Sequence, residues 1–242
     1  MNKTNIGWCT HTWNPAVGCL NGCPWCYARR MAHRGLTKCS LCTTFVPHLH
    51  PERLVTPGLV SKRPRVVFVG SMCDLWSAGM KQEWRDKMFR VMCLHRQHQY
   101  VLLTKRPGNI TMQDELYLQD AGIWVGTSIT CGADMHRLSD LKQRALDRSI
   151  VSIEPLLGPI PTSFITHRPR WISWVIVGGL TGPGAIAPSL QWIKAIRDAC
   201  LNNRIPLWEK ENLPTCSVLL ENKRIQQAPD PIADILFREE NK

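Results

Sequence analysis

The chain has 242 residues, enough for one sizeable α/β domain but too few for a barrel with a second large domain, so we expect a single domain over residues 1–242. Its composition, 44% hydrophobic and 20% charged, is that of a globular protein, and no apolar run approaches the ~20 residues of a membrane span. The net charge of +11 favours a polyanionic partner, above all nucleic acid, although the basic residues are scattered and a plain solvated surface stays open.

The N-terminus lacks the apolar core of a signal peptide, and this favours the reducing cytoplasm. The 11 cysteines are an odd number without the spacing of a disulfide framework. We therefore expect them to be thiols or metal ligands.

Residues 5–13 are predicted to form a first strand, and Cys19, Cys23 and Cys26 follow it in C-x3-C-x2-C spacing. Thiolates are soft ligands that suit zinc, copper(I) or iron–sulfur clusters, and three of them leave one coordination position open. The alternative is a zinc knuckle whose fourth ligand lies elsewhere, with Cys9, His11, Cys39 and Cys42 as candidates.

A first helix is predicted over residues 24–35, with a basic distal half. Residues 36–64 then form an irregular excursion rich in cysteine and proline, which is long for a plain loop. Within it, Cys39 and Cys42 bind a second metal together with histidines, donate thiols to an auxiliary cluster, or are two ordinary loop cysteines. The last interpretation is slightly favoured, and we expect both cysteines to be dispensable for a centre at Cys19, Cys23 and Cys26.

The remaining chain alternates between short apolar runs and helical patterns, as in a parallel sheet buried on both faces. The predicted strands are 65–70, 100–104, 123–128, 150–154, 174–178 and 205–208. The predicted helices are 80–95, 132–148 and 190–201. The pattern predicts an α/β fold, a partial or near-complete parallel (β/α) barrel of about six to seven units.

Polar residues follow nearly every predicted strand, where such barrels carry their chemistry. Helix N-caps explain some of them, Asp74 and Ser128 in particular. The candidate cofactor-binding residues are Trp25, Tyr27, Ser71, Asp74, Thr104, Lys105, Thr127, Ser128, Ser152, Glu154, Gly178 and Gly179. Lys105, Glu154 and Lys210 are the candidate catalytic residues.

The cysteine spacing, with the aromatic Trp25 before the last cysteine, resembles the signature of the radical S-adenosylmethionine (radical SAM) superfamily. Over most of its length the chain also resembles a family of compact phage and prophage proteins related to these enzymes. The matching stretches are Trp13-Asn14-Pro15, Gly18-Cys19-x-x-Gly22-Cys23-x-x-Cys26-Tyr27-Ala28-Arg29-Arg30, His50-Pro51-Glu52-Arg53-Leu54, Ser71-Met72-x-Asp74-Leu75, Leu103-Thr104-Lys105-Arg106-Pro107, Ser152-Ile153-Glu154-Pro155-Leu156 and Val175-Ile176-Val177-Gly178-Gly179. The chain departs from that family at Leu180-Thr181 and at Trp208-Glu209-Lys210-Glu211, which become candidates for the substrate side.

The resemblance implies a radical-SAM type of barrel in which Cys19, Cys23 and Cys26 hold a [4Fe–4S] cluster whose fourth iron binds S-adenosylmethionine (SAM). It implies reductive cleavage of SAM to a 5′-deoxyadenosyl radical, with the electron supplied by an external donor such as flavodoxin or ferredoxin. Trp25 would neighbour the adenine, while Lys105, Thr127, Ser128 and Glu154 would contact the ribose, carboxylate and amine.

The resemblance and the charge together favour modification of a nucleic-acid base, DNA rather than RNA, and in particular a rearrangement in phage thymine hypermodification. The compartment would then be the host cytoplasm. The alternatives are a radical SAM enzyme acting on a tRNA base or a small molecule, and a zinc-binding protein that binds nucleic acid without catalysis.

Overall fold

The computed structural model describes the chain except for residues 36–37, 57, 120–121, 167–168, 215–223 and 238–242. Its centre is an eight-stranded sheet in the order β1-β2-β5-β6-β7-β8-β9-β10, in which β1 is antiparallel to β2 and the other neighbours are parallel. The strands are β1 (Asn2–Lys3), β2 (His11–Trp13), β5 (Val66–Val69), β6 (Gln99–Thr104), β7 (Ile123–Ser128), β8 (Ser149–Ile153), β9 (Ile172–Val177) and β10 (Leu207–Glu209).

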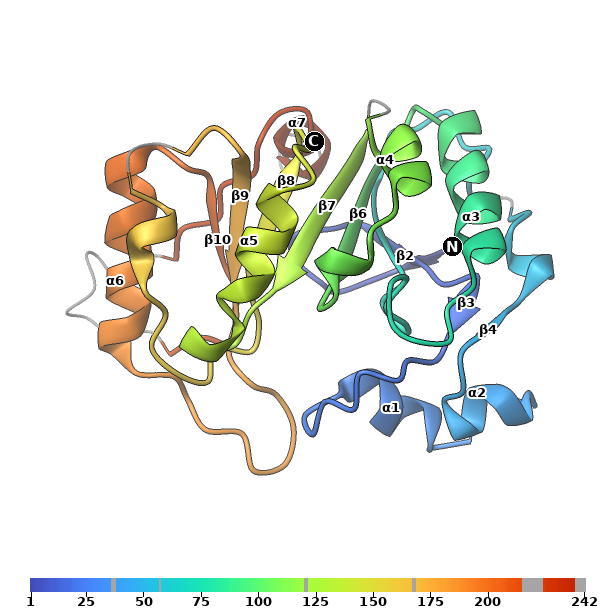
Figure 1. Ribbon diagram of the computed structural model, residues 1–242, viewed down its shortest axis with the longest axis horizontal. Coiled ribbons are helices and arrows are strands. Elements are labelled where there is room, and N and C mark those ends of the chain that lie inside the picture. Colours follow the sequence, from blue (N-terminus) through green and yellow to red (C-terminus); the bar gives the residue numbers. More distant parts are fainter. Residues whose placement is uncertain (36–37, 57, 120–121, 167–168, 215–223, 238–242) are drawn as a thin grey trace.

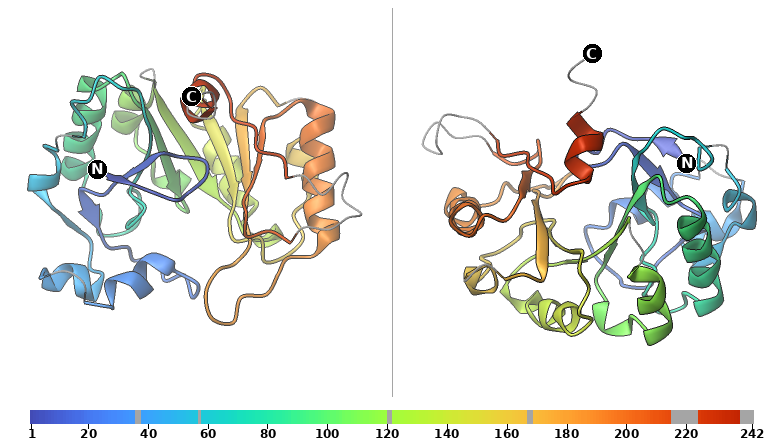
Figure 2. Two further views of the ribbon diagram at one scale, coloured as in Figure 1. Left: turned by 180° about the vertical axis from the view of Figure 1, so that it is seen from behind. Right: turned by 90° about the horizontal axis from the view of Figure 1, so that it is seen from above.

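Helices connect most of the parallel strands and cover the outer face of the curved sheet (Figures 1 and 2). These are α3 (Gln82–Leu94), α4 (Met112–Leu118), α5 (His136–Lys142) and α6 (Leu190–Asn203), with the short 3-10 helices η2 (Pro107–Asn109), η3 (Gly132–Asp134) and η4 (Thr162–Phe164). None of the helices described is long and apolar enough to cross a membrane.

A smaller unit lies beside the carboxyl ends of the strands (Figure 1). It contains β3 (Ala16–Val17), α1 (Tyr27–Ala32), α2 (Ser40–Thr44), β4 (His48–Leu49) and the 3-10 helix η1 (Pro51–Arg53). Its two strands pair antiparallel. The excursion expected at 36–64 therefore contributes ordered elements that fold back onto the chain next to Cys19.

Side chains alternate between the two faces of the sheet, because successive residues of a strand point to opposite sides. On β5, Val67 and Val69 pack against the outer helices, whereas Val66 belongs to a cluster on the inner face. This inner cluster contains four buried tryptophans, Trp8, Trp124, Trp174 and Trp208. Ile232 of α7 (Ile232–Leu236) joins it, so α7 covers the inner face of the sheet.

The expected α/β fold with a parallel sheet is confirmed, but the sheet does not close. Among the described residues, β1 and β10 form its two edges and do not pair with each other. In the view from above in Figure 2, α7 lies on the side of the molecule opposite the outer helices.

The strand predicted over residues 5–13 is wrong except for its end, since a turn in which the Cys9 N–H donates to Ile6 O precedes β2. The helix predicted over 132–148 is also too long: α5 ends at Lys142, and Ala145 adopts a left-handed φ of 49°.

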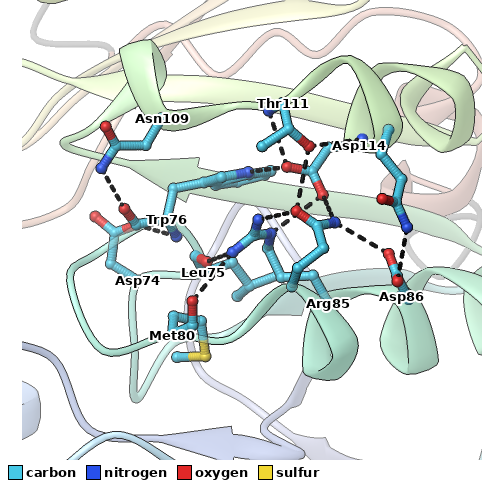
Figure 3. Close-up of polar contacts among 11 residues, drawn as sticks. Asp74, Leu75, Trp76, Met80, Arg85, Asp86, Asn109, Thr111 and Asp114 are labelled. Atoms are coloured by element: carbon cyan, nitrogen blue, oxygen red, sulfur yellow. Dashed lines mark hydrogen bonds and ion pairs between the residues drawn. The ribbon is translucent and has the colours of Figure 1, made fainter.

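Asp114, on α4, is the centre of a buried network that joins α3 and α4 to the loop after β5 (Figure 3). Its carboxylate accepts hydrogen bonds from Trp76 Nε1 at 3.0 Å, Gln82 Nε2 at 2.7 Å and Arg85 Nε at 3.1 Å. Thr111 completes a capping box with it. Although burial alone would raise the pKa of Asp114, the hydrogen bonds from these four residues hold it below its ordinary value.

We expect D114N to lower the free energy of unfolding by about 3 kcal/mol at neutral pH, because it leaves the buried Arg85 guanidinium without its counter-charge. A carboxyl whose pKa is lowered by folding stabilises the fold above its unfolded pKa. The difference between wild type and D114N should therefore be complete above about pH 5 and shrink as the pH falls below about 4. Denaturant unfolding across this pH range measures it.

D147N is the matched control, because Asp147 is exposed. Equal destabilisation by both variants, or a difference that does not change with pH, would contradict this account of the network.

Candidate functional site

A cavity of about 380 Å³ lies at the carboxyl ends of the parallel strands, a size typical of small-molecule sites. It is bounded on one side by the cysteine loop and on the other by strand ends and the loop after β9. The expected site residues that line it are Cys19, Cys23, Cys26, Trp25, Tyr27, Ser71, Asp74, Thr104, Lys105, Ser128, Ser152, Glu154, Gly179 and Lys210.

The structure does not bring Thr127 and Gly178 to the cavity surface. Thr127 precedes the inward-facing Ser128 on β7, so it points to the other face, where its hydroxyl donates to Thr104 O at 3.0 Å. Gly178 has a steric role. A Cβ there would lie 2.7 Å from Glu154 Oε1 and 2.9 Å from Lys210 Cδ.

The Glu154 carboxylate and the Lys210 ammonium form the ion pair that Gly178 leaves room for, with Nζ 2.7 Å from Oε1. Ser152 Oγ donates to the other carboxylate oxygen at 3.1 Å. All three residues come from the ends of β8 and β10 and line the cavity. The pair is partly exposed, so each charge can exchange its partner for a bound ligand.

Asp74 is a support for the cavity wall, because both of its carboxylate oxygens are already in use. Oδ1 accepts from Thr104 Oγ1 at 2.7 Å and from Trp76 N at 3.0 Å. Oδ2 accepts from Lys105 N at 2.8 Å and from Asn21 Nδ2 at 2.7 Å. A single carboxylate thus fastens the cysteine loop to the end of β6.

The cysteine loop presents its sulfurs to backbone donors. Asn21 N donates to Cys19 Sγ and Arg29 N donates to Cys26 Sγ, each at 3.4 Å. Burial raises the pKa of the Cys19 thiol. An electrophilic centre that binds the sulfur as thiolate would offset this penalty, since metal ligation deprotonates thiols.

Two arginines of α1 hold this loop in place. Arg29 Nη2 donates to Cys19 O at 3.4 Å, while Arg30 donates to Trp25 O at 3.2 Å and to Thr181 O at 3.1 Å. The second residue therefore links the cysteine loop to the loop after β9. Both loops lie at the same end of the molecule in Figure 1.

Glu209 is not on the substrate side, contrary to the expectation from its place in the last strand. It is buried on the outer face, where Arg197 Nε donates to its Oε1 at 2.8 Å. The neighbouring Lys210 continues the alternation and reaches the cavity.

Sequence reasoning missed two amides that shape the site. Asn21 lies inside the cysteine motif and bonds Asp74, while Asn212 Nδ2 donates to Gly179 O at 2.7 Å and its Oδ1 accepts from Gly179 N at 3.2 Å. Asn212 comes two residues after Lys210, so the rule that strand ends carry the site would have found it. Asn21 offers no comparable signal beyond its position between two cysteines.

Cys39, Cys42, His48 and His50 converge outside the cavity, with all four ligand atoms within 4.8 Å of one another. The structure therefore places Cys39 and Cys42 beside two histidines, which is the arrangement that the metal-binding alternative expects. Neither cysteine lines the cavity that the three-cysteine loop bounds.

The other two candidates for a fourth ligand also lie elsewhere. Cys9 is buried in the inner core, where burial raises the pKa of its thiol strongly. His11 Nδ1 lies 2.9 Å from the Thr10 hydroxyl. Neither residue lines the cavity.

Comparison with known proteins places the chain in a family. The family model described as "Protein of unknown function (DUF5131)" matches residues 3–215, which include both cysteine groups and the strands of the sheet from β2 to β10. No curated protein and no solved structure matches the chain. Because the family model covers most of its length, the chain belongs to the DUF5131 family.

Proposed function

We propose that this protein is a radical SAM enzyme that modifies a nucleic-acid base, with thymine in DNA as the leading substrate. The observation that carries the proposal is the meeting of the C-x3-C-x2-C cysteines and the polar ends of several strands in one cavity. Cysteines for a redox centre and groups for an organic cofactor are thus available on opposite walls of the same space.

Cys19, Cys23 and Cys26 fit an iron–sulfur cluster better than a single ion. A tetrahedral zinc ion with Zn–S bonds of about 2.3 Å would draw its sulfurs to about 3.8 Å from one another. Within the described part of the chain, the ligand group whose atoms all approach within 4.8 Å is the other one, at Cys39, Cys42, His48 and His50. A cubane cluster binds each thiolate to a different iron and accepts wider spacing.

When bound, the cluster supplies the electron for reductive cleavage of SAM. The chain's own residues would bind and orient SAM. Trp25 offers an apolar surface for the adenine, and Ser128 and Ser152 offer hydroxyls for the ribose. Lys105 and the Glu154–Lys210 pair offer charges of both signs, as a zwitterionic amino-acid group requires.

The floor of the cavity is apolar. Trp8 and Phe68 line it, with their ring centroids 4.9 Å apart, and Trp8 packs edge-on against Trp174 beneath. A dry floor suits radical chemistry, because it keeps reactive species away from competing partners.

The net charge of +11 supports a nucleic-acid substrate, since it raises the local concentration of a polyanion. A base within a duplex would have to leave the stack to reach the cavity. An external one-electron donor such as flavodoxin or ferredoxin would complete the system.

Anaerobic reconstitution with iron and sulfide should load about four of each per chain, and the loaded protein should release 5′-deoxyadenosine from SAM under reducing conditions. The triple variant C19A/C23A/C26A should lose both properties, because it removes all three thiolates of the loop. Iron and sulfide assays with chromatography of the nucleoside product measure the effect.

C131A is the control, because Cys131 is a partly buried cysteine that does not line the cavity. Wild-type protein that takes up zinc but no iron would refute the enzyme and leave the non-catalytic zinc-binding alternative. So would equal iron loss in C131A and the triple variant.

Binding of a thymine-containing oligonucleotide should weaken steeply with salt, with a slope of about −0.7 to −0.9 per phosphate contact. The exposed residues Arg34 and Arg106 flank the site in sequence, and replacing either with Gln should make the slope less negative by about 1. Fluorescence anisotropy at several salt concentrations measures it.

K142Q is the matched control, because Lys142 is exposed at the end of α5, which leads into the start of β8 and so lies away from the carboxyl ends of the strands. Salt-independent binding, or SAM cleavage that no DNA or RNA stimulates, would instead favour a small-molecule substrate.

A further inference from the structure

We infer that Cys39, Cys42, His48 and His50 bind one zinc ion in a closed tetrahedral site that supports the cysteine loop of the cavity. The inference rests on these four residues and their neighbours. It is independent of whether Cys19, Cys23 and Cys26 hold a cluster.

The spacing of the ligand atoms is that of a single metal centre. His48 Nε2 lies 3.6 Å from Cys39 Sγ and 3.4 Å from Cys42 Sγ, while His50 Nε2 lies 3.1 Å from Cys42 Sγ and 2.9 Å from His48 Nε2. Zinc bonds of about 2.3 Å to sulfur and about 2.0 Å to nitrogen place tetrahedral ligands about 3.3–3.8 Å apart. Small shifts of the two rings would complete this geometry.

Local structure aims the ligands at one point. Cys39 is the N-cap of α2 and Cys42 lies in that helix, so the two sulfurs belong to a single turn. His48 and His50 are two residues apart on an extended segment, where alternate side chains share a face. The helix thus supplies two thiols and the strand two imidazoles.

The second nitrogen of each ring is held by an acceptor. His48 Nδ1 lies 2.7 Å from Val46 O, and His50 Nδ1 lies 2.8 Å from Glu52 Oε1. A carbonyl and a carboxylate can only accept, so each Nδ1 carries the proton and each Nε2 presents its lone pair. Two lone pairs at 2.9 Å repel each other unless a cation lies between them, and such outer partners are typical of zinc-bound histidine.

The ligand set selects zinc among the common metals. Two thiolates and two imidazoles form a closed tetrahedral set for structural zinc. A [2Fe–2S] cluster with the same residues would separate the cysteines onto one iron and the histidines onto the other. Cys42 Sγ instead lies within 3.4 Å of both histidine nitrogens, which indicates a single ion.

This centre lies directly behind the cysteine loop of the cavity. β4, which carries His48, pairs with β3, and Val17 opposite His48 is two residues before Cys19. His50 N donates to Pro15 O at 2.7 Å, and Cys19 N donates to Phe45 O at 3.3 Å.

A small apolar cluster fills the space between the two groups. Val17, Ala28, Cys42 and Phe45 form it, and Cys19 and Cys26 pack against it. An ion that fixes residues 39–50 therefore also fixes the backbone from which Cys19 projects.

The test measures zinc directly in full-length protein expressed with added zinc. Wild-type protein and the C19A/C23A/C26A variant should each contain about one zinc per chain by elemental analysis, whereas H48A/H50A should contain less than a tenth of that. Replacement of zinc by Co²⁺ in the wild type should give the intense visible absorption of tetrahedral cobalt bound to thiolate.

H136A is the matched control for histidine removal, because His136 is exposed and its Nδ1 lies 3.1 Å from a backbone carbonyl, Ala133 O. E52Q keeps all four ligands and weakens the outer partner of His50, at the further cost of an exposed ion pair with Arg53. It should lower zinc affinity about tenfold in a chelator competition, even if H48A/H50A fails to fold.

The inference is overturned if wild-type protein holds no more zinc than H48A/H50A, if cobalt gives a weak octahedral spectrum, or if zinc is lost with C19A/C23A/C26A. Loss of zinc in the last case would place the ion in the cavity. A zinc-loaded protein that cleaves no SAM would instead contradict the proposed function and leave this site standing.

Discussion

The carboxylate of Asp74 is the point at which three distant parts of the chain meet. It follows β5, and it binds the end of β6 through Thr104 and Lys105 and the cysteine loop through Asn21. Behind it, Trp76 carries the connection on to the buried pair of Asp114 and Arg85. The cavity keeps its shape because a charge-assisted network fastens a short irregular loop to a rigid sheet.

Most of the site follows from two rules that act on the sequence alone. Apolar runs predict the parallel strands. The carboxyl ends of these strands lie at the same end of the sheet, and this brings Lys105, Ser128, Glu154 and Lys210 together. The alternation of side chains then decides which residues reach the interior. Applied strictly, this alternation would also have excluded Thr127 from the cavity and predicted that Glu209 faces outward, because their neighbours Ser128 and Lys210 face inward.

Long-range pairing explains what the sequence does not reveal. The Cys39, Cys42, His48 and His50 group forms only once β4 pairs with β3, and neither two-residue strand has a periodicity that could be recognised. The same holds for α4, whose seven residues owe their place to the burial of Asp114. The open sheet is a further case, since the apolar pattern of β10 does not say whether it meets β1, the strand at the other edge.

Gly18 shows how closely the two cysteine groups are joined. Its φ is +95°, and a Cβ there would lie 2.3 Å from the backbone of Val46, between the helix of Cys42 and the strand of His48. Gly18 is not itself one of the cysteines or histidines, yet any side chain on it would push the segment of residues 39–50 away from Cys19. The absence of a side chain at Gly18 thus lets residues 39–50 lie close against the cysteine loop. A larger residue at position 18 would displace the Cys39, Cys42, His48 and His50 group relative to Cys19, Cys23 and Cys26.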